Sequence, residues 1–106
     1  MTQSYELTHE VLGAALVVRA RGKFDRAAGE AVESLLGGHS GPRVLNLAVV
    51  EYLSSTGIAY LAKLTSSLEL RIAAPADCVR QTVSLAGIER ILSIFDDEAQ
   101  AMAVDG

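Results

Sequence analysis

This sequence has one cysteine, two histidines, no tryptophan and only 5% aromatic residues among its 106 positions. Because Cys78 has no second cysteine to pair with, the chain cannot form an internal disulfide, which suits a reducing compartment. One cysteine and two distant histidines cannot build a zinc site, so we expect no metal and no cofactor. The scarcity of aromatic side chains also removes the stacking platforms that single-stranded nucleic acid uses.

The chain also lacks clustered basic residues and long apolar runs. Its nine Lys and Arg residues are scattered and its net charge is -4, so we expect no nucleic-acid partner, because clustered cations drive that binding. The first residues, MTQSYELTHEVLG, have neither the basic start nor the apolar stretch of a signal peptide. No segment reaches the roughly 18 uninterrupted apolar residues of a membrane span. We therefore expect a cytoplasmic protein that does not insert into a membrane.

A large apolar fraction is what the chain does have. Hydrophobic residues make up 50% of the sequence and charged residues 21%, and the mean hydropathy is +0.30. Disordered chains combine low hydrophobicity with high net charge, so this composition predicts a folded protein. A length of 106 residues fits one ordinary domain. The expected organisation is a single domain over residues 1–106.

Local patterns predict strands that alternate with helices. Two short apolar-polar segments on either side of Gly13 indicate a β-hairpin, and Gly22 is expected to end its second strand. Asp25 is expected to cap the first helix, because its carboxylate can accept hydrogen bonds from free amides. The run RVLNLAVV is nearly continuous in apolar β-formers, the pattern of a strand covered on both faces. The predicted strands are 5–11, 15–21, 43–50, 68–74 and a short 91–95, and the predicted helices are 26–36, one from Gly57, one from Pro75 to Gly87 and a last one beginning at residues 96–98.

Each of the later strands in this order is followed by a helix. Right-handed crossovers then bring successive strands side by side and parallel, with the helices against the sheet. We therefore predict a single α/β or mixed α+β domain, with a mixed, mostly parallel sheet of four to five strands packed against about four helices.

Motifs for common enzymatic chemistry are absent. A P-loop needs a glycine five residues before Gly22, and that position holds Val17. The hydroxyl residues at 54–56 lack the flanking glycines of a serine-hydrolase elbow. His9 and His39 have no nucleophile to pair with and are expected on the surface. No catalytic residue is predicted, and a weak nucleotide-binding or hydrolytic activity is the hypothesis with the least support.

Three consecutive hydroxyl residues, Ser54, Ser55 and Thr56, stand where the apolar strand passes into the next helix. Hydroxyl side chains before a helix normally cap its free amides, and each cap contributes about 1 kcal/mol. One cap needs one hydroxyl, so two are in excess. A phosphate at a helix N-terminus finds free amides and a favourable dipole, and it adds about 1.5 to 2 negative charges to the surface. A hydroxyl in this loop therefore suits a phosphorylation switch.

A larger pattern extends over about residues 5–104. Its parts are a strand ending in RARGKFD, the run RVLNLAVVEYLSSTGIAYLAKL with a hydroxyl-rich loop that closes on Gly57, and the segment ELRIAAPADCVRQTVSLAGIERILSIFDDEAQAM with a Gly87-Ile88 pair before the last apolar run. In this order and spacing the parts resemble STAS domains, and bacterial anti-sigma factor antagonists in particular.

The resemblance implies a non-enzymatic module that binds an anti-sigma factor, typically a serine/threonine kinase of the histidine-kinase-like ATPase type, and it leaves room for a phosphatase. In that scheme the unphosphorylated form captures the anti-sigma factor and frees a sigma factor, and the phosphorylated form lets go. The phosphorylated hydroxyl of the family directly precedes the glycine of the second helix, which makes Thr56 the implied acceptor and Ser55 the less favoured one. The implied partner-binding residues are Asp25, Ser54, Ser55, Thr56, Gly57, Ile58 and Tyr60.

Two positions depart from the pattern of the antagonists. Ser54 stands where their loop usually has an acidic residue, and Asn46 stands where their strand frequently has aspartate. These departures keep a second hypothesis open, a STAS docking subunit of a transporter or of a stressosome-like signalling complex that is never phosphorylated and in which Thr56 is a cap. Gly57 is expected to let a partner approach the backbone closely.

Overall fold

A computed structural model describes residues 5–103, and the outermost residues of the predicted domain 1–106 lie outside this range. The chain begins with a hairpin of β1 (Tyr5–Leu12) and β2 (Ala15–Phe24), which pair antiparallel along the whole length of β1. Gly13 adopts φ +62° in the connecting turn, a conformation that glycine tolerates. The predicted hairpin is therefore confirmed.

The prediction that Gly22 ends the second strand is wrong. Gly22 lies inside β2 with φ +83°, and the strand continues to Phe24. Because glycine has no Cβ, it can take this left-handed conformation within a strand, where it marks an irregularity in the pairing rather than a break. The pairing of β2 with the next strand does shift register directly after Gly22.

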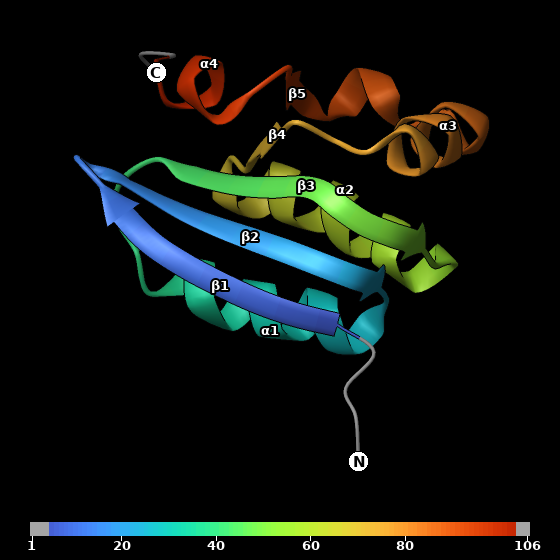
Figure 1. Ribbon diagram of the computed structural model, residues 1–106, viewed down its shortest axis with the longest axis horizontal. Helices are drawn as coiled ribbons and strands as arrows, with labels where there is room; N and C mark the ends of the chain where they lie inside the picture. The colour runs from blue at the N-terminus through green and yellow to red at the C-terminus, as the bar shows by residue number, and fades with distance from the viewer. Residues whose placement is uncertain (1–4, 104–106) are drawn as a thin grey trace.

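One five-stranded sheet forms the centre of the molecule, with its strands in the order β1-β2-β3-β4-β5 (Figure 1). Strands β2 to β5 run parallel to one another, and β1 is antiparallel to β2. The remaining elements are α1 (Arg26–Gly37), β3 (Arg43–Leu53), α2 (Ser55–Leu68), β4 (Arg71–Ala73), α3 (Asp77–Ala86), the short 3-10 helix η1 (Glu89–Ile91), β5 (Ser93–Phe95) and α4 (Glu98–Ala103). The predicted α/β fold, with a mostly parallel sheet and about four helices, is confirmed.

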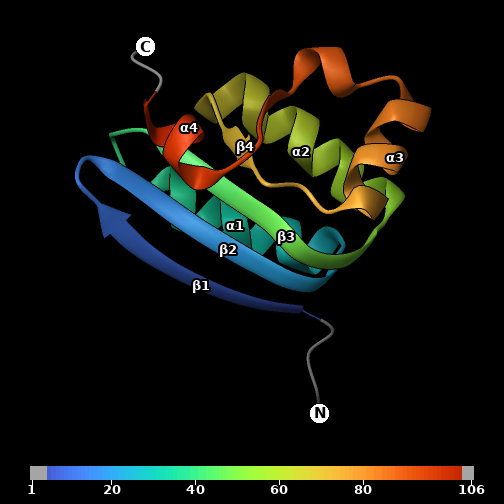
Figure 2. The same cartoon turned by 45° about the horizontal axis from the view of Figure 1, so that its top comes forward.

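Helices cover the two faces of the sheet unequally (Figure 2). α1, α2 and α3 share the main core with the strand residues on one face. The largest buried side chains of this core include Phe24, Leu36, Leu45, Leu47, Leu61, Leu64, Leu70 and Ile72. α4 lies on the other face, where Ala101 belongs to a small buried cluster with Val17 and Val44.

The fourth strand is shorter than the predicted segment 68–74. α2 continues to Leu68, and Glu69 ends it in a left-handed conformation with φ +53°. Only Arg71–Ala73 pairs as β4. The first residues of LELRIAA suit the end of a helix as well as a strand, because short apolar runs do not distinguish the two.

The third helix begins later than predicted. α3 starts at Asp77, and its N-cap Ala76 offers no side-chain hydrogen bond. Pro75 is buried in the connection that follows β4, after Ala74 has turned the chain with φ +49°. Proline therefore precedes the helix here instead of occupying its first turn. The predicted strand 91–95 is likewise shortened, because its first residue belongs to η1.

Candidate functional site

The carboxyl ends of β2 and β3 place the starts of α1 and α2 side by side (Figure 1). Asp25 follows β2, and its Oδ1 accepts a hydrogen bond from the amide of Ala28 at 3.1 Å. Ser54 follows β3, and its Oγ accepts a hydrogen bond from the amide of Gly57 at 3.0 Å. The predicted cap at Asp25 is confirmed, and Ser54 is the hydroxyl that caps α2.

The second helix begins earlier than predicted. α2 starts at Ser55, so Ser55 and Thr56 belong to its first turn and not to a loop before Gly57. Both side chains are exposed, whereas the hydroxyl of Ser54 is occupied by the cap. Within residues 5–103 neither of the two exposed hydroxyls takes part in a side-chain hydrogen bond. They stand free at the start of the helix, where another protein can reach them.

Gly57 is buried against the end of β2. A Cβ at this position would lie 2.2 Å from the carbonyl oxygen of Phe24 and 3.0 Å from Cδ1 of Leu53. The same carbonyl oxygen accepts a hydrogen bond from the amide of Ser54 at 3.1 Å. Glycine is therefore needed for packing inside the protein. The missing Cβ faces Phe24 and not the surface, and the close approach of a partner to this backbone stays a prediction.

Ile58 and Tyr60 are half-buried on α2 and pack against the main core. Tyr60 also lies against Gly29 of α1, where a Cβ would come within 2.5 Å of the tyrosine ring. Nζ of Lys63 stands 5.3 Å from the centroid of that ring and 3.0 Å from Oε2 of Glu33, whose carboxylate raises the pKa of Lys63. These contacts join α1 to α2, so Tyr60 offers a partner only the exposed part of its side chain.

The structure brings most of the predicted site residues to one edge of the sheet. Asp25 and Ser54 stand at neighbouring strand ends, and Ser55 and Thr56 follow in the first turn of α2. The arrangement offers two accessible alcohols beside two helix N-termini, whose amides and dipoles favour nearby negative charge. An exposed alcohol in such a position is chemically able to accept a transferred group.

A polar cluster that the sequence did not reveal lies on the face of the sheet that carries α4. Nε and Nη2 of Arg19 each donate to a carboxylate oxygen of Glu98 at 2.8 Å, and Nη1 of Arg19 donates to Glu10. Nδ2 of Asn46 donates to Oε2 of Glu98 at 2.6 Å. The hydrogen bonds from Arg19 lower the pKa of Glu98, against the opposing effect of its partial burial. An aspartate at position 46 would set a second carboxylate against Glu98, so asparagine suits this position.

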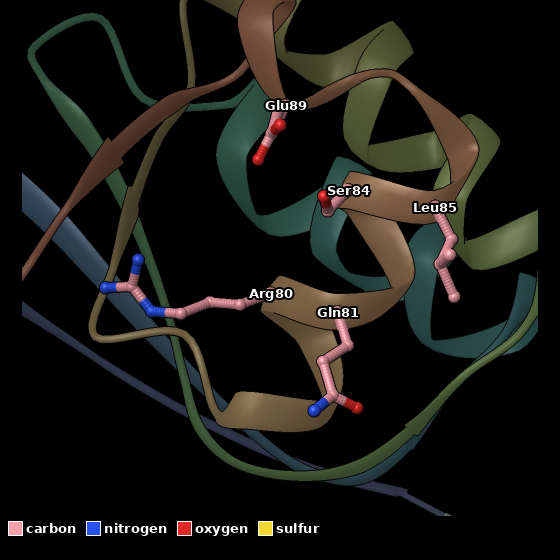
Figure 3. A pocket seen from close by; sticks show the side chains of 5 residues that line it. All are labelled: Arg80, Gln81, Ser84, Leu85 and Glu89. Atoms are coloured by element: carbon pink, nitrogen blue, oxygen red, sulfur yellow. The ribbon is translucent and has the colours of Figure 1, made fainter.

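A hollow of about 560 Å³ opens beside the end of α3 (Figure 3). It is lined by Arg80, Gln81, Ser84, Leu85 and Glu89. In Figure 3 the side chain of Arg80 points away from those of Gln81 and Leu85, so the three do not converge on a common ligand position. None of the lining residues belongs to the predicted site.

The two histidines have no hydroxyl side chain as a partner within the described range. His9 is exposed on β1, as expected, whereas His39 is half-buried with its Nε2 2.8 Å from the carbonyl oxygen of Ala14. Among residues 5–103 no three His, Cys, Asp or Glu side chains gather as metal ligands. Over the same residues, no helix has both the length and the apolar character to cross a bilayer.

Known structures share this fold. The chain matches an anti-sigma factor antagonist from Mycobacterium paratuberculosis with a TM-score of 0.80 and 23% identity, over 93% of this chain and 92% of that one. It matches the anti-sigma factor antagonist SpoIIAA in its unphosphorylated form with a TM-score of 0.71 and 16% identity, over 95% and 100% of the two chains. For Bacillus SpoIIAA in the phosphorylated form the TM-score is 0.66 at 17% identity, over 92% and 96%.

A transporter protein has the same fold. The chain matches a sulfate transporter family protein from Wolinella succinogenes with a TM-score of 0.71 and 19% identity, over 89% of this chain and 86% of that one. No sequence among the curated proteins matches this chain significantly.

A family model settles the broader relationship. The model described as the STAS domain matches residues 6–101, which run from β1 into α4. This range contains all of the sheet except Tyr5, both capped helix starts and the exposed hydroxyls. The resemblance seen in the sequence is confirmed, and the chain belongs to the STAS domain family.

Proposed function

We propose that this protein is an anti-sigma factor antagonist that works by partner switching in the cytoplasm. Its unphosphorylated form binds an anti-sigma factor, a serine/threonine kinase of the histidine-kinase-like ATPase type, and phosphorylation of Thr56 releases that partner. The observation that supports this most directly is that Ser54 supplies the cap of α2 and leaves the Thr56 hydroxyl exposed. The protein is a binding module without a catalytic residue or cofactor of its own, and a phosphatase resets it.

A phosphate on Thr56 changes the surface more than the fold. The group would stand in the first turn of α2, where the helix dipole favours negative charge. Because Thr56 is exposed, the phosphate displaces no core side chain. In the interface with a partner it adds about 1.5 to 2 negative charges that have to be desolvated. A penalty of about 2.7 kcal/mol lowers the affinity roughly a hundredfold, which is enough to exchange partners.

The proposed interface is built around the first turn of α2. Ser55 and Thr56 are its exposed centre, and the capped start of α1 at Asp25 lies next to them. Ile58 and Tyr60 contribute the parts of their side chains that the core leaves uncovered. Ser54 and Gly57 complete the interface and also hold the turn in position, Ser54 through its cap and Gly57 through its packing on Phe24.

The proposal is tested by producing each of the host's anti-sigma factor kinases of this class and mixing it with the protein. Binding to the unmodified protein is measured by isothermal titration calorimetry with ADP. ATP is then added, and the modified residue is located by mass spectrometry. One kinase is expected to bind and to transfer phosphate to Thr56, with release of the complex.

Two variants sharpen this experiment. Thr56→Ala is expected to bind the kinase and to remain bound when ATP is added, because the acceptor is gone. Ser55→Ala is the matched control, since it removes the neighbouring exposed hydroxyl and should still be released. Phosphate on another residue, or full affinity after Thr56 is phosphorylated, contradicts the proposal.

A second candidate function is a docking subunit that is never phosphorylated. The likeness to a sulfate transporter family protein supports it, and so does Ser54 at a position where antagonists usually have an acidic residue. In this role the domain joins transporter components or a stressosome-like complex through the same surface. Neither Thr56→Ala nor the addition of ATP should then change binding, which distinguishes this role from the switch.

A further inference from the structure

The face of the sheet that carries α4 is covered only in part. Every second side chain of β2 from residue 17 to residue 23 points to this face, because alternate residues of a strand point the same way. Val17 is buried beneath α4, and Arg19 is bonded to Glu98 at the start of that helix. Arg21 and Lys23 lie beyond α4 and are exposed. Figure 2 shows this half of β2 and β3 with no helix over it.

Two irregularities in β3 place apolar side chains beside these cations. β3 contains two more residues than β2 in this stretch, so the register shifts twice. As a result Val49 is paired with Arg21, and Tyr52 is paired with Lys23. Val49 and Tyr52 are each 55% exposed, while their neighbour Val50 stays in the core. Bulges of this kind re-aim side chains and are frequent beside functional sites.

Within residues 5–103, Arg21 and Lys23 differ from most other cations in having no ion-pair or side-chain hydrogen-bond partner. Ion pairs or hydrogen bonds to helix carbonyl groups engage six of the nine Lys and Arg residues within residues 5–103, namely Arg19, Arg26, Arg43, Lys63, Arg71 and Arg80. Glu6 stands opposite Arg21 on β1 but forms no ion pair with it in the described range. The only other unpartnered cation of that range is Arg90, so two of the three stand together on the bare half of the sheet.

A shallow hollow of about 200 Å³ adjoins Arg21 and Val49. Its lining residues are Glu6, Thr8, Arg19, Ala20, Arg21 and Val49. It therefore reaches from the edge strand β1 to the exposed Val49 and leaves room for a side chain of a partner. Exposed apolar residues beside cations, together with a hollow, are features of a protein interface.

We propose that the open sheet patch, defined as Arg21, Lys23, Val49 and Tyr52, binds an acidic segment of the protein partner that also carries a large apolar side chain. Carboxylates of the segment pair with the two free cations, and its apolar side chain packs on Val49 and Tyr52. Charge complementarity of this kind raises the association rate and excludes partners of the wrong charge.

The patch is continuous with the edge where the hydroxyls are exposed. Lys23 and Tyr52 each lie two residues before a helix cap, Asp25 and Ser54 respectively. For the identity of the partner the inference rests on the proposed function, since a protein seated on the first turn of α2 would reach the patch directly. The net charge of -4 opposes a long polyanion, so a short acidic protein segment is favoured over nucleic acid or an anionic membrane.

A synthetic peptide of alternating glutamate and leucine tests the chemistry of the patch without the partner. The peptide is titrated into ¹⁵N-labelled protein, and the amide shifts are expected to cluster at the open sheet patch. Reversing both charges with Arg21→Glu and Lys23→Glu should weaken binding by about tenfold or more. Arg90→Glu, which reverses the third free cation elsewhere, is the matched control and should bind as before. Absent or scattered shifts, equal affinity in the charge-reversed variant, or binding to phosphatidylglycerol vesicles in place of the peptide overturns the inference.

The kinase experiment separates this inference from the proposed function. A kinase that binds the unmodified protein should bind the doubly charge-reversed variant about tenfold or more weakly, and Tyr52→Ala should weaken it as well. Circular dichroism confirms that these surface variants are folded. Equal kinase binding by all of them overturns the inference and leaves the proposed function intact. If no kinase binds the unmodified protein, the proposed function fails, and the peptide titration still decides the inference.

Discussion

Replacing Gly57 with alanine tests the packing that fixes the start of α2. The new Cβ would lie 2.2 Å from the carbonyl oxygen of Phe24, and an ordinary contact begins at 3.4 Å, so the two atoms have to separate by about 1.2 Å. Overpacking of this kind costs about 1 to 3 kcal/mol. The movement also weakens the hydrogen bond from the amide of Ser54, which is worth about 1 kcal/mol. This loss roughly cancels the gain of about 1 kcal/mol in helix propensity that alanine has over glycine.

The expected result is a loss of about 2 kcal/mol in the free energy of unfolding, or a melting temperature lower by roughly 10 °C. Urea unfolding followed by circular dichroism measures it. Gly37→Ala is the matched control, because that helical glycine has nothing within 4 Å of its added Cβ and should gain about 0.4 to 1 kcal/mol. If the two variants are equally stable, the close packing assigned to Gly57 is refuted.

Three further predictions concern stability. Ser54→Ala removes the cap of α2 and should lower the free energy of unfolding by about 1 kcal/mol; an unchanged urea midpoint would show that the cap is unimportant. Leu64→Ala opens a cavity at a fully buried position and should lower the free energy of unfolding by about 2 to 5 kcal/mol. Leu85→Ala, at a side chain that is 90% exposed, should change it by no more than about 0.5 kcal/mol. Similar losses for both variants would contradict the assigned core. Because Arg19 lowers the pKa of Glu98, their pairing stabilises the fold above the ordinary carboxyl pKa of 4.5 and is lost as the pH falls through the lowered folded value. Glu98→Gln should therefore flatten the acid side of the stability profile, and a profile unchanged below pH 4.5 would argue against this pairing.

Local chemistry was enough to predict most of the fold. Local conformational preferences decide three of its features: the turn at Gly13, the cap at Asp25 and the continuous apolar run of β3. In each case residues close in the sequence are enough to determine the local structure. Gly22 was misread because its conformation depends on the pairing of β2 with β3, in which β3 carries extra residues. The predicted strand 68–74 starts too early because α2 continues to Leu68 and Glu69 closes it in a left-handed conformation that few non-glycine residues adopt.

The candidate site could be found from the sequence, but not the separate roles of its residues. Three adjacent hydroxyls are visible in the sequence, whereas the assignment of Ser54 to the cap depends on where the helix begins. The role of Gly57 depends on a carbonyl group 33 positions earlier, at Phe24. The bond between Arg19 and Glu98 joins residues 79 positions apart, so no local pattern announces it.

The carbonyl oxygen of Phe24 positions the start of α2. This oxygen accepts a hydrogen bond from the amide of Ser54 and leaves no room for a side chain at the buried Gly57, so the end of β2 fixes where α2 begins. Because its start is fixed in this way, we expect the first turn of α2 to keep its position when a group or a partner binds to its exposed side. A group attached to Thr56 would therefore stay at a constant distance from Asp25. It would act on the protein that docks at this surface and not through a conformational change of the domain itself.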